Sequence, residues 1–120
     1  MTYLWIFLGG GLGSVARYGV SKVAASYYSG NFPLGTFVAN ILACLVLAVL
    51  IVFVVPKNSE STWLQPLLMV GFCGGFSTFS TFSNETTELL QSGHMGVALL
   101  NIAVSILVGV GLIFWIRSVA

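Results

Sequence analysis

The chain has 120 residues, of which 58% are hydrophobic and only 6% are charged, and its formal net charge is +1. An ordinary soluble domain has roughly 25% charged residues, so this chain has too few charges to cover the surface of a water-soluble monomer. Four scattered basic residues form no patch for nucleic acid, and the composition fits neither a collagen, a coiled coil nor a disordered chain. The remaining class is an integral membrane protein in a lipid bilayer.

Turn-forming residues divide the chain into four apolar segments, and a helix needs about 20 apolar residues to cross a bilayer. The first expected span covers about residues 3–28. It has no basic region before its apolar run, so we expect it to be retained and not cleaved as a signal peptide. The other spans are expected at about 34–55, 62–91 and 95–118. The sequence thus predicts an all-α membrane protein with four transmembrane helices in a single domain, residues 1–120.

The basic residues give no preferred orientation in the membrane. Lys57 and Arg117 fall on the side of both termini, while Arg17 and Lys22 fall on the other side, so the positive charge is equal. Because positive charge sets topology, this balance favours insertion both ways and an antiparallel pair. The alternative, in which the N-terminal amine or a partner decides the orientation, stays open.

Small residues four positions apart lie on one helix face, where two backbones can approach closely. Three such pairs occur along the chain: Gly9 and Gly13, Gly71 and Gly75, and Ser105 and Gly109. Together they predict close helix packing within a subunit or between subunits.

The third segment contains an unusual stretch, GFCGGFSTFSTFSNE, from Gly71 to Glu85. Each of its glycines weakens a helix by about 1 kcal/mol relative to alanine. A break in the helix would free carbonyl and N–H groups inside the protein, as in the broken helices that form ion or substrate sites. A continuous glycine-rich helix packed closely on a neighbour explains the same residues equally well, so both interpretations stay open.

Phe76, Phe79 and Phe82 follow at a spacing of three, which on a continuous helix places them in one slowly drifting stripe. Hydroxyl side chains, Ser80 and Thr81 among them, lie between the rings. Ring edges have partial positive charge and hydroxyls donate hydrogen bonds, so together they can line an anion path without a fixed cation that would slow passage. On the residues alone, plain packing of the rings in a core is the favoured interpretation.

Polar side chains inside the other apolar segments need a partner or a function, because an unbonded amide in hydrocarbon is unstable. Thr36 and Asn40 share one face of the second segment, and Asn101 and Ser105 share one face of the fourth. The simpler role for Asn40 is an interhelical hydrogen bond.

Arg17 is a charged side chain far along the first apolar segment. We expect it to reach the nearer membrane surface or to line a vestibule, with an ion pair to Glu85 or Glu88 as the other possibility. The only histidine, His94, falls in a predicted turn, and no metal-ligand cluster or nucleophile–base pair is apparent. We therefore expect no enzymatic activity.

Three motifs resemble, in sequence and order, those of the Fluc/CrcB-type fluoride ion channels: GGGLGSVARY (Gly9–Tyr18), PLGTFVAN (Pro33–Asn40) and GFCGGFSTFSTFSNE (Gly71–Glu85). The resemblance spans nearly the whole chain. It implies an antiparallel, dual-topology homodimer of four-helix subunits with two pores, in which the third helix is broken mid-membrane. It also implies a fluoride-selective passive channel, multi-pass in the bacterial inner (plasma) membrane, that exports toxic fluoride from the cytoplasm and gives fluoride resistance.

The resemblance further implies which side chains contact fluoride. Phe79 and Phe82 resemble the ring-edge contacts, and Asn40 resembles the second-helix amide that faces the ion. The other hydroxyl and amide groups assigned to this path are Thr36, Ser80, Thr81, Ser105 and Asn101. Family members often have a tyrosine near position 101 and a hydroxyl near position 109, and this chain has Asn101 and Gly109 there.

The resemblance also covers three other positions. Arg17, which we assign to a vestibule, and Glu85 both occupy positions that are typical of the family. The break at Gly74–Ser77 resembles one whose main-chain carbonyls hold a structural sodium ion (Na+) at the dimer interface. No organic cofactor is implied.

Two other functions compete with the channel. A small four-helix multidrug or cation exporter has about this length, but it needs a membrane-embedded carboxylate for proton exchange. The first, second and fourth segments contain no Asp or Glu. The second alternative is a non-conducting structural membrane subunit. Fluoride efflux without proton coupling from vesicles that contain only this chain distinguishes the channel from both.

Overall fold

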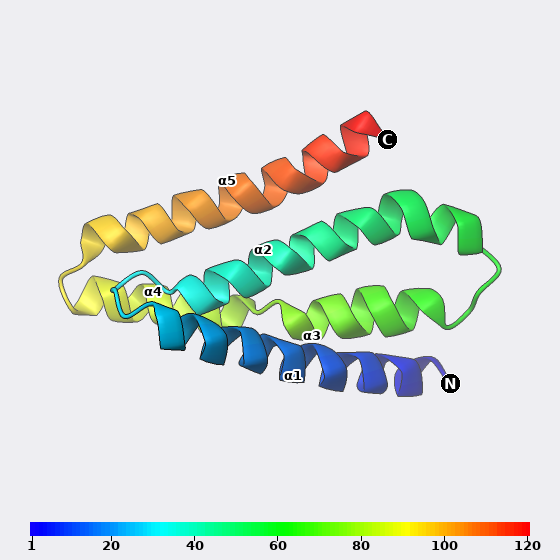
Figure 1. Ribbon diagram of the computed structural model, residues 1–120, viewed down its shortest axis with the longest axis horizontal. Helices are drawn as coiled ribbons and strands as arrows, with labels where there is room; N and C mark the ends of the chain where they lie inside the picture. Colours follow the sequence, from blue (N-terminus) through cyan, green and yellow to red (C-terminus); the bar gives the residue numbers. More distant parts are fainter.

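The computed structural model describes residues 1–120 as a chain of helices without strands (Figure 1). The elements in chain order are α1 (Thr2–Tyr27), α2 (Leu34–Val49), η1 (Leu50–Val54), η2 (Val55–Asn58), η3 (Gln65–Cys73), α3 (Gly74–Phe76), α4 (Phe79–Gln91) and α5 (Met95–Val119). Because η1 and η2 continue α2, and η3, α3 and α4 follow one another, these elements form four antiparallel helical segments. The prediction of an all-α chain with four helices is confirmed.

The second segment is longer than predicted. Helical turns continue through Asn58, whereas a polar loop is expected from Pro56 onward. A proline lacks an N–H group and its ring clashes with the carbonyl four residues earlier, so a regular α-helix cannot continue through Pro56. The chain adapts by widening into π-helical turns at Leu50–Val54 and then tightening into a 3-10 turn.

The third segment is interrupted between α3 and α4. It begins at Gln65, with Pro66 in the first turn, where a missing N–H group does no harm. The helix stops after Phe76, and Ser77 (φ −86°, ψ 157°) and Thr78 (φ −152°, ψ 118°) are extended before α4 begins. The glycines before the break are themselves helical. Of the two interpretations of this stretch, the broken helix is the correct one.

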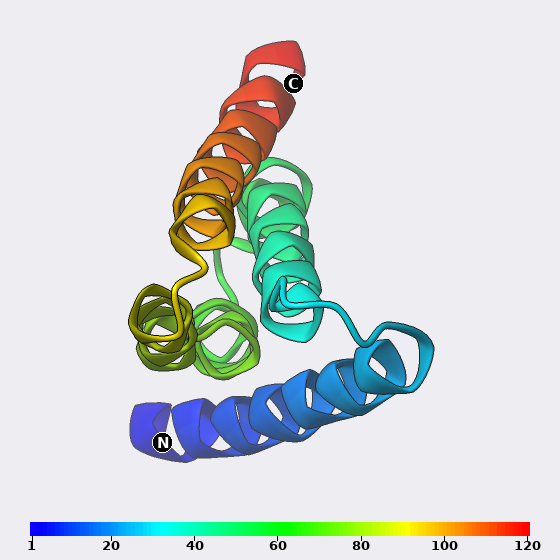
Figure 2. The ribbon, with the colours of Figure 1, turned by 90° about the vertical axis from the view of Figure 1, so that its left-hand side faces the viewer.

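Close backbone packing is nevertheless present at the predicted small residues. A Cβ added at Gly9 or Gly13 would overlap main-chain atoms of the third segment, and one added at Gly71 or Gly75 would overlap main-chain atoms of α1. Seen from the end of the molecule, α1 crosses directly beside the third segment (Figure 2). At Gly109, a Cβ would lie 3.3 Å from a sulfur atom of α2, so α5 approaches α2 closely as well.

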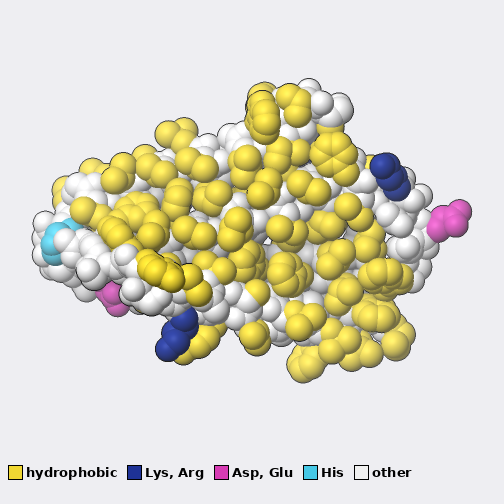
Figure 3. Space-filling view, in the orientation of Figure 1, with side chains coloured by type: hydrophobic (Ala, Val, Ile, Leu, Met, Phe, Trp, Pro, Cys, Tyr) yellow, Lys and Arg dark blue, Asp and Glu magenta, His cyan; other side chains and the backbone are white.

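Apolar side chains cover most of the surface. Only 17 of the 120 residues are buried, and Figure 3 shows hydrophobic side chains across the visible face, with the charged ones away from its middle. Two helical stretches, Leu34–Asn58 and Met95–Val119, are long and apolar enough to cross a bilayer, and an 18-residue portion of each has a mean hydropathy of 3.1 and 2.6, respectively. Only 22% and 17% of the residues in these two portions are buried, unlike the core helices of a soluble protein. The molecule has the surface of a membrane protein.

Both termini lie at the same end of the long axis, together with the loop between the second and third segments (Figure 1). The other two connections, at residues 28–33 and 92–94, lie at the opposite end. The long axis measures 51 Å, enough to pass through a bilayer of about 40–45 Å including its headgroups. The arrangement is that expected for four antiparallel segments.

Candidate functional site

A cavity of about 290 Å³ lies beside the break in the third segment. Residues of α2, the break, α4 and α5 line it: Asn40, Ile41, Cys44, Ser77, Thr78, Phe79, Phe82, Ser105 and Ile106. None of these nine side chains is charged. The fold therefore brings together predicted site residues that are far apart in the sequence, in a wall that combines amide, hydroxyl and ring groups with two isoleucines and a cysteine.

Asn40 connects α2 to the non-helical backbone of the break. Its Oδ1 accepts a hydrogen bond from the main-chain N–H of Thr78 at 2.8 Å, and its Nδ2 donates to the Thr78 carbonyl at 3.4 Å. The interhelical hydrogen bond expected for Asn40 is thus present. Because an amide nitrogen has two hydrogens, one donor of Asn40 remains for a group inside the cavity.

Thr78 is a site residue that the sequence analysis missed. Its Oγ1 accepts a hydrogen bond from the main-chain N–H of Thr81 at 3.3 Å and so caps the start of α4. The same oxygen lies 3.3 Å from the Ser80 Oγ and 3.2 Å from the Thr81 Oγ1. Ser80 and Thr81 therefore join a hydroxyl cluster at the helix start and do not line the cavity. A threonine three positions before another polar residue, at a helix start, is the signal that identifies this cap.

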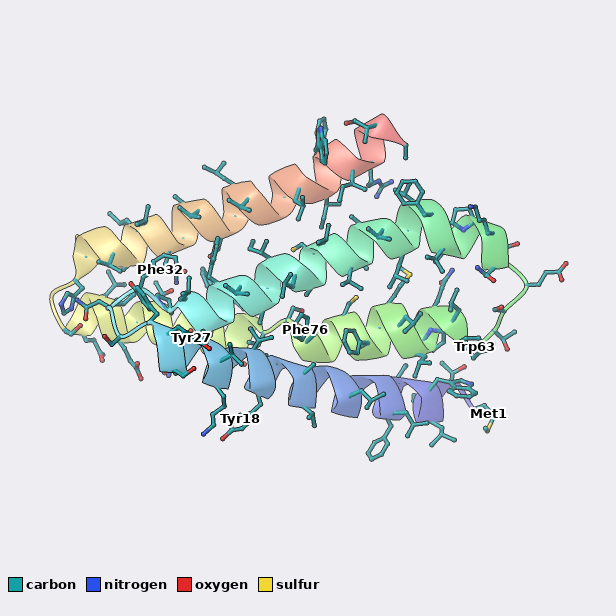
Figure 4. The ribbon with its side chains drawn as sticks, in the orientation of Figure 1. Met1, Tyr18, Tyr27, Phe32, Trp63 and Phe76 are labelled. Carbon is teal, nitrogen blue, oxygen red and sulfur yellow. The ribbon has the colours of Figure 1, made fainter.

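Phe79 and Phe82 both line the cavity, with ring centroids 6.0 Å apart and ring planes tilted by 36°. Phe79 is 78% exposed in the single chain. Phe76 lies elsewhere: it is buried in the core with Ala39 and stacks on Phe72 at 5.6 Å (Figure 4). The prediction of one stripe of three rings is wrong, because the break between α3 and α4 separates Phe76 from Phe79 and Phe82.

Thr36 and Glu85 lie together in a different cavity of about 200 Å³, between α1, α2, α4 and the loop after α1. The Glu85 Oε1 is buried there without a hydrogen-bond partner. This cavity lies at the end of the molecule where Phe32 is found (Figure 4). A larger neighbouring cavity of about 510 Å³ shares Glu85 and extends toward the loop between α4 and α5. The predicted path residues thus fall into two groups along the molecule.

Arg17 points from α1 toward the break. Its Nε donates a hydrogen bond to the Gly75 carbonyl at 3.1 Å, and neither Glu85 nor Glu88 accepts a hydrogen bond from it. Carbonyls in the last turn of a helix have no helical donor and a partial negative charge, so a guanidinium is a favourable partner for α3. The ion pair to Glu85 or Glu88 that was the other possibility for Arg17 is thus not formed, and the contact with Gly75 takes its place.

Asn101 lies behind the cavity wall and is only 1% exposed. Its Nδ2 donates to the Thr86 Oγ1 at 3.1 Å, and its Oδ1 accepts from the Ser105 Oγ at 3.2 Å. Ser105 lines the cavity, whereas Asn101 does not. Thr86 is the second polar residue that the sequence analysis missed; its position one helical turn after Phe82 is the signal that places it on the same face of α4.

Gly74 and Ser77 line a further cavity of about 190 Å³. The Thr78 N–H, the usual helical donor to the Gly74 carbonyl, donates to Asn40 instead. The Thr81 N–H, the usual donor to the Ser77 carbonyl, donates to the Thr78 Oγ1. The break therefore takes the regular helical donor from both carbonyls. No group of three or more His, Cys, Asp or Glu side chains that could hold a metal ion is present.

Comparisons with known proteins identify one family over nearly the whole chain. The family described as CrcB-like protein, Camphor Resistance (CrcB), matches residues 4–116. A Flavobacterium psychrophilum protein named fluoride-specific ion channel FluC is 44% identical over 108 residues, which cover 90% of this chain and 87% of the relative. Proteins of the same name match from Coxiella burnetii (44% over 107 residues; 88% and 86% covered) and Pyrococcus abyssi (41% over 113 residues; 94% and 90% covered). The chain belongs to the CrcB-like protein family.

Proposed function

We propose that the chain is a fluoride-selective passive ion channel that exports toxic fluoride from the cytoplasm. The observation that supports this function most directly is the uncharged cavity in which the Asn40 amide, the Ser105 hydroxyl and the rings of Phe79 and Phe82 converge. Independent support comes from relatives that are named fluoride-specific ion channels and that match this chain over most of their length.

The groups around this cavity suit a small, strongly hydrated anion. A conducting site must replace the water around the ion with donors that are close but weak enough to release it. Amide and hydroxyl hydrogens and the positive edges of aromatic rings meet this requirement. A lysine or arginine in the wall would bind the ion more strongly, and none lines the cavity.

A fluoride efflux assay tests the function. Purified chain is reconstituted into vesicles loaded with potassium fluoride, valinomycin is added to balance charge, and a fluoride electrode records release. We expect rapid efflux without any proton gradient. Release no faster than from protein-free vesicles rejects the proposal.

We further propose that two subunits assemble as an antiparallel, dual-topology homodimer with two pores. The equal positive charge on the two sides favours insertion in both orientations. The Phe79 ring is 78% exposed in the single chain, and a second subunit that completes the pore would bury it.

A cleavable C-terminal tag in sealed vesicles tests the dual topology. About half of the tags should resist external protease if both orientations occur. Complete cleavage or complete protection contradicts dual topology.

The proposal includes four transmembrane spans per subunit in the bacterial inner (plasma) membrane. The two long apolar stretches support spans two and four, and α1 and the third segment run antiparallel beside them. We assign Arg17 to a vestibule, because it lies one helical turn before Ser21, which lines the cavity of Thr36 and Glu85.

We also propose that the carbonyls of Gly74 and Ser77 hold a structural sodium ion at the dimer interface. Their loss of regular helical donors at the break supports this assignment, since a hard cation such as Na+ prefers oxygen ligands. The ion would join the two subunits and take no part in conduction.

One observation favours a second candidate function, a proton-coupled exporter of cations. The Glu85 Oε1 is buried without a partner at a cavity, and coupled exporters need such a carboxylate. The two functions differ in their driving force. Cation uptake driven by a pH gradient, abolished by Glu85→Gln and without fluoride release, supports the exporter; fluoride release by the chain alone excludes both this function and a non-conducting structural subunit.

A further inference from the structure

A chain of hydrogen bonds runs behind the wall of the uncharged cavity and joins α5 to α4. The Ser105 Oγ donates to the Asn101 Oδ1 at 3.2 Å, the Asn101 Nδ2 donates to the Thr86 Oγ1 at 3.1 Å, and the Thr86 Oγ1 donates to the Phe82 carbonyl at 2.8 Å. Asn101 at its centre is 1% exposed and Thr86 is 7% exposed, so water does not compete for these bonds. Ser105 and Phe82, at the two ends of the chain of bonds, line the cavity, whereas Asn101 and Thr86 do not.

All three bonds run in the same direction, from Ser105 through Asn101 and Thr86 to the Phe82 carbonyl, and we call this the inward direction. A serine hydroxyl has one hydrogen, and here that hydrogen points to Asn101. The Ser105 oxygen therefore presents its lone pairs to the cavity. Lone pairs repel an anion, so in this arrangement Ser105 cannot assist an anion beside Phe79 and Phe82.

The chain of bonds has a second arrangement that uses the same atoms. The oxygen and nitrogen ends of an amide are nearly equal in size, so a half-turn of the Asn101 amide exchanges them with no other movement. The Nδ2 then donates to the Ser105 Oγ, and the Thr86 hydroxyl turns from the Phe82 carbonyl to the Asn101 Oδ1. The Phe82 carbonyl keeps the main-chain N–H of Thr86 as its partner inside α4. The Ser105 hydrogen is now free to point into the cavity.

The two arrangements differ by one hydrogen bond. In the inward arrangement there are three donated hydrogen bonds: from Ser105 to Asn101, from Asn101 to Thr86 and from Thr86 to the Phe82 carbonyl. In the reversed arrangement they make two, and the Ser105 hydrogen lacks an acceptor until an anion lies in the cavity. The empty cavity therefore favours the inward direction. An anion supplies the missing acceptor, and a hydrogen bond to a charged acceptor is stronger than a neutral one.

We propose that Asn101 and Thr86 are positioning residues that set the direction of the Ser105 hydroxyl, inward when the cavity is empty and toward the ion when fluoride occupies it. This inference rests on the proposed fluoride channel. Each proton stays on its own oxygen or nitrogen, and only the two hydroxyls and the amide rotate. The reversal makes donation by Ser105 depend on occupancy, so the site binds the ion without holding it as a fixed donor would.

Removal of the Thr86 hydroxyl gives a prediction whose sign distinguishes this role from a merely structural one. In Thr86→Val the inward arrangement loses two bonds and the reversed one loses a single bond, so the bias toward the inward direction disappears. We expect the fluoride concentration for half-maximal current to fall several-fold, about the effect of one hydrogen bond. A helix contact that was only structural would give weaker binding or no change.

The experiment measures fluoride currents through reconstituted chain in planar bilayers, with potassium fluoride as the probe. Thr86→Ser keeps the hydroxyl and should restore the wild-type value. Thr87→Val is the matched control, because the Thr87 Oγ1 makes the same bond to a carbonyl four residues earlier, to Ser83, but is exposed and does not contact Asn101. The half-maximal concentration of this control should not change.

A double-mutant cycle tests whether Thr86 acts through Ser105. On a Ser105→Ala background, Thr86→Val should leave the half-maximal fluoride concentration unchanged. An equal shift on both backgrounds, or a rise in place of a fall, overturns the inference while the channel function stands. If the wild-type chain conducts no fluoride, the proposed function fails and this inference fails with it.

A spectroscopic measurement covers the case in which Thr86→Val does not fold. In wild-type chain in lipid nanodiscs, labelled with ¹⁵N-asparagine, the Asn101 side-chain signal is assigned by its loss in Asn101→Gln. Potassium fluoride should shift this signal, and Ser105→Ala should abolish the shift. An Asn101 signal that ignores fluoride, in a preparation that conducts it, contradicts the reversal.

Discussion

The rings of Phe79 and Phe82 are the residues whose chemistry is most specific to the proposed path. Isoleucine is apolar and of similar bulk but has no ring edge with partial positive charge. We expect Phe79→Ile and Phe82→Ile each to lower fluoride efflux by about tenfold or more, which corresponds to about 1.4 kcal/mol. Efflux from vesicles measures the effect. Phe7→Ile is the control, because Phe7 is 75% exposed on α1 and lines none of the cavities described above; equal losses at Phe7 and Phe79 contradict ring-edge contacts.

Asn40 offers a second test at the scale of one residue. Asn40→Asp replaces a donor with a negative charge and removes the hydrogen bond to the Thr78 carbonyl. We expect fluoride efflux to fall by about tenfold or more, since like charges repel in a medium of low dielectric constant. The matched control is Asn58→Asp, which also loses an amide-to-carbonyl bond, to Val54, but at the exposed end of η2. Wild-type efflux from Asn40→Asp would place Asn40 outside the path.

The contacts that the sequence does not predict join partners from distant parts of the chain. Arg17 contacts Gly75, 58 positions away, and the contact exists only because the break exposes a helix end. Helical spacing places Thr86 on the same face of α4 as Phe82, but its partner Asn101 comes from a different helix. By contrast, the polar faces of Thr36 with Asn40 and of Asn101 with Ser105 follow from helical spacing alone, so the sequence predicts them directly.

At the scale of elements, the packing of α1 on the third segment gives a stability test. A Cβ at Gly13 would overlap main-chain atoms of the third segment, which cannot move aside like a flexible side chain. We expect Gly13→Ala to destabilise the protein by about 1–3 kcal/mol, measured as a lower midpoint of thermal unfolding in detergent. Gly11→Ala is the control on the same helix, since nothing lies within 4 Å of a Cβ there. Equal midpoints for the two variants contradict tight packing at Gly13.

The elements differ in how far the sequence determines them. Turn-forming residues place the four helical segments, because glycine, proline and short polar runs interrupt an apolar pattern wherever they occur. The break is harder to predict, because glycines suit both a weakened helix and a close helix contact, and this chain uses them for the contact. The interruption lies after them, at Ser77 and Thr78, where Asn40 provides hydrogen bonds that a local sequence pattern does not contain. The prediction that Phe76 shares one stripe with Phe79 and Phe82 is wrong for the same reason, because it assumes a helix without this interruption.

At the scale of the whole molecule, the proposed sodium ion predicts a dependence on the cation in the buffer. Replacing sodium with N-methyl-D-glucamine, which is too large for a site between main-chain carbonyls, should reduce fluoride efflux or shift the purified protein from dimer to monomer. Size-exclusion chromatography and the electrode assay measure the two effects. Identical elution and efflux in both buffers contradict a structural sodium ion.

Composition alone identifies the molecule as a membrane protein, because it has too few charged side chains to cover the surface of a water-soluble protein. The surface agrees, since most residues of each long apolar helix are not buried in the single chain. The quaternary arrangement does not follow from one chain in the same way, since equal charge on the two sides removes a preference without specifying a partner.

The bonds between Asn40 and Thr78 also bear on the order of events during biogenesis. The main-chain N–H and carbonyl of Thr78 are satisfied by a side chain of α2, not by groups of their own segment. Before α2 docks, the third segment satisfies its peptide groups best as an uninterrupted helix, which is the form in which a single segment is most stable in lipid. We therefore expect the kink to appear late, after translocation, as a product of docking and not as a feature of the nascent segment.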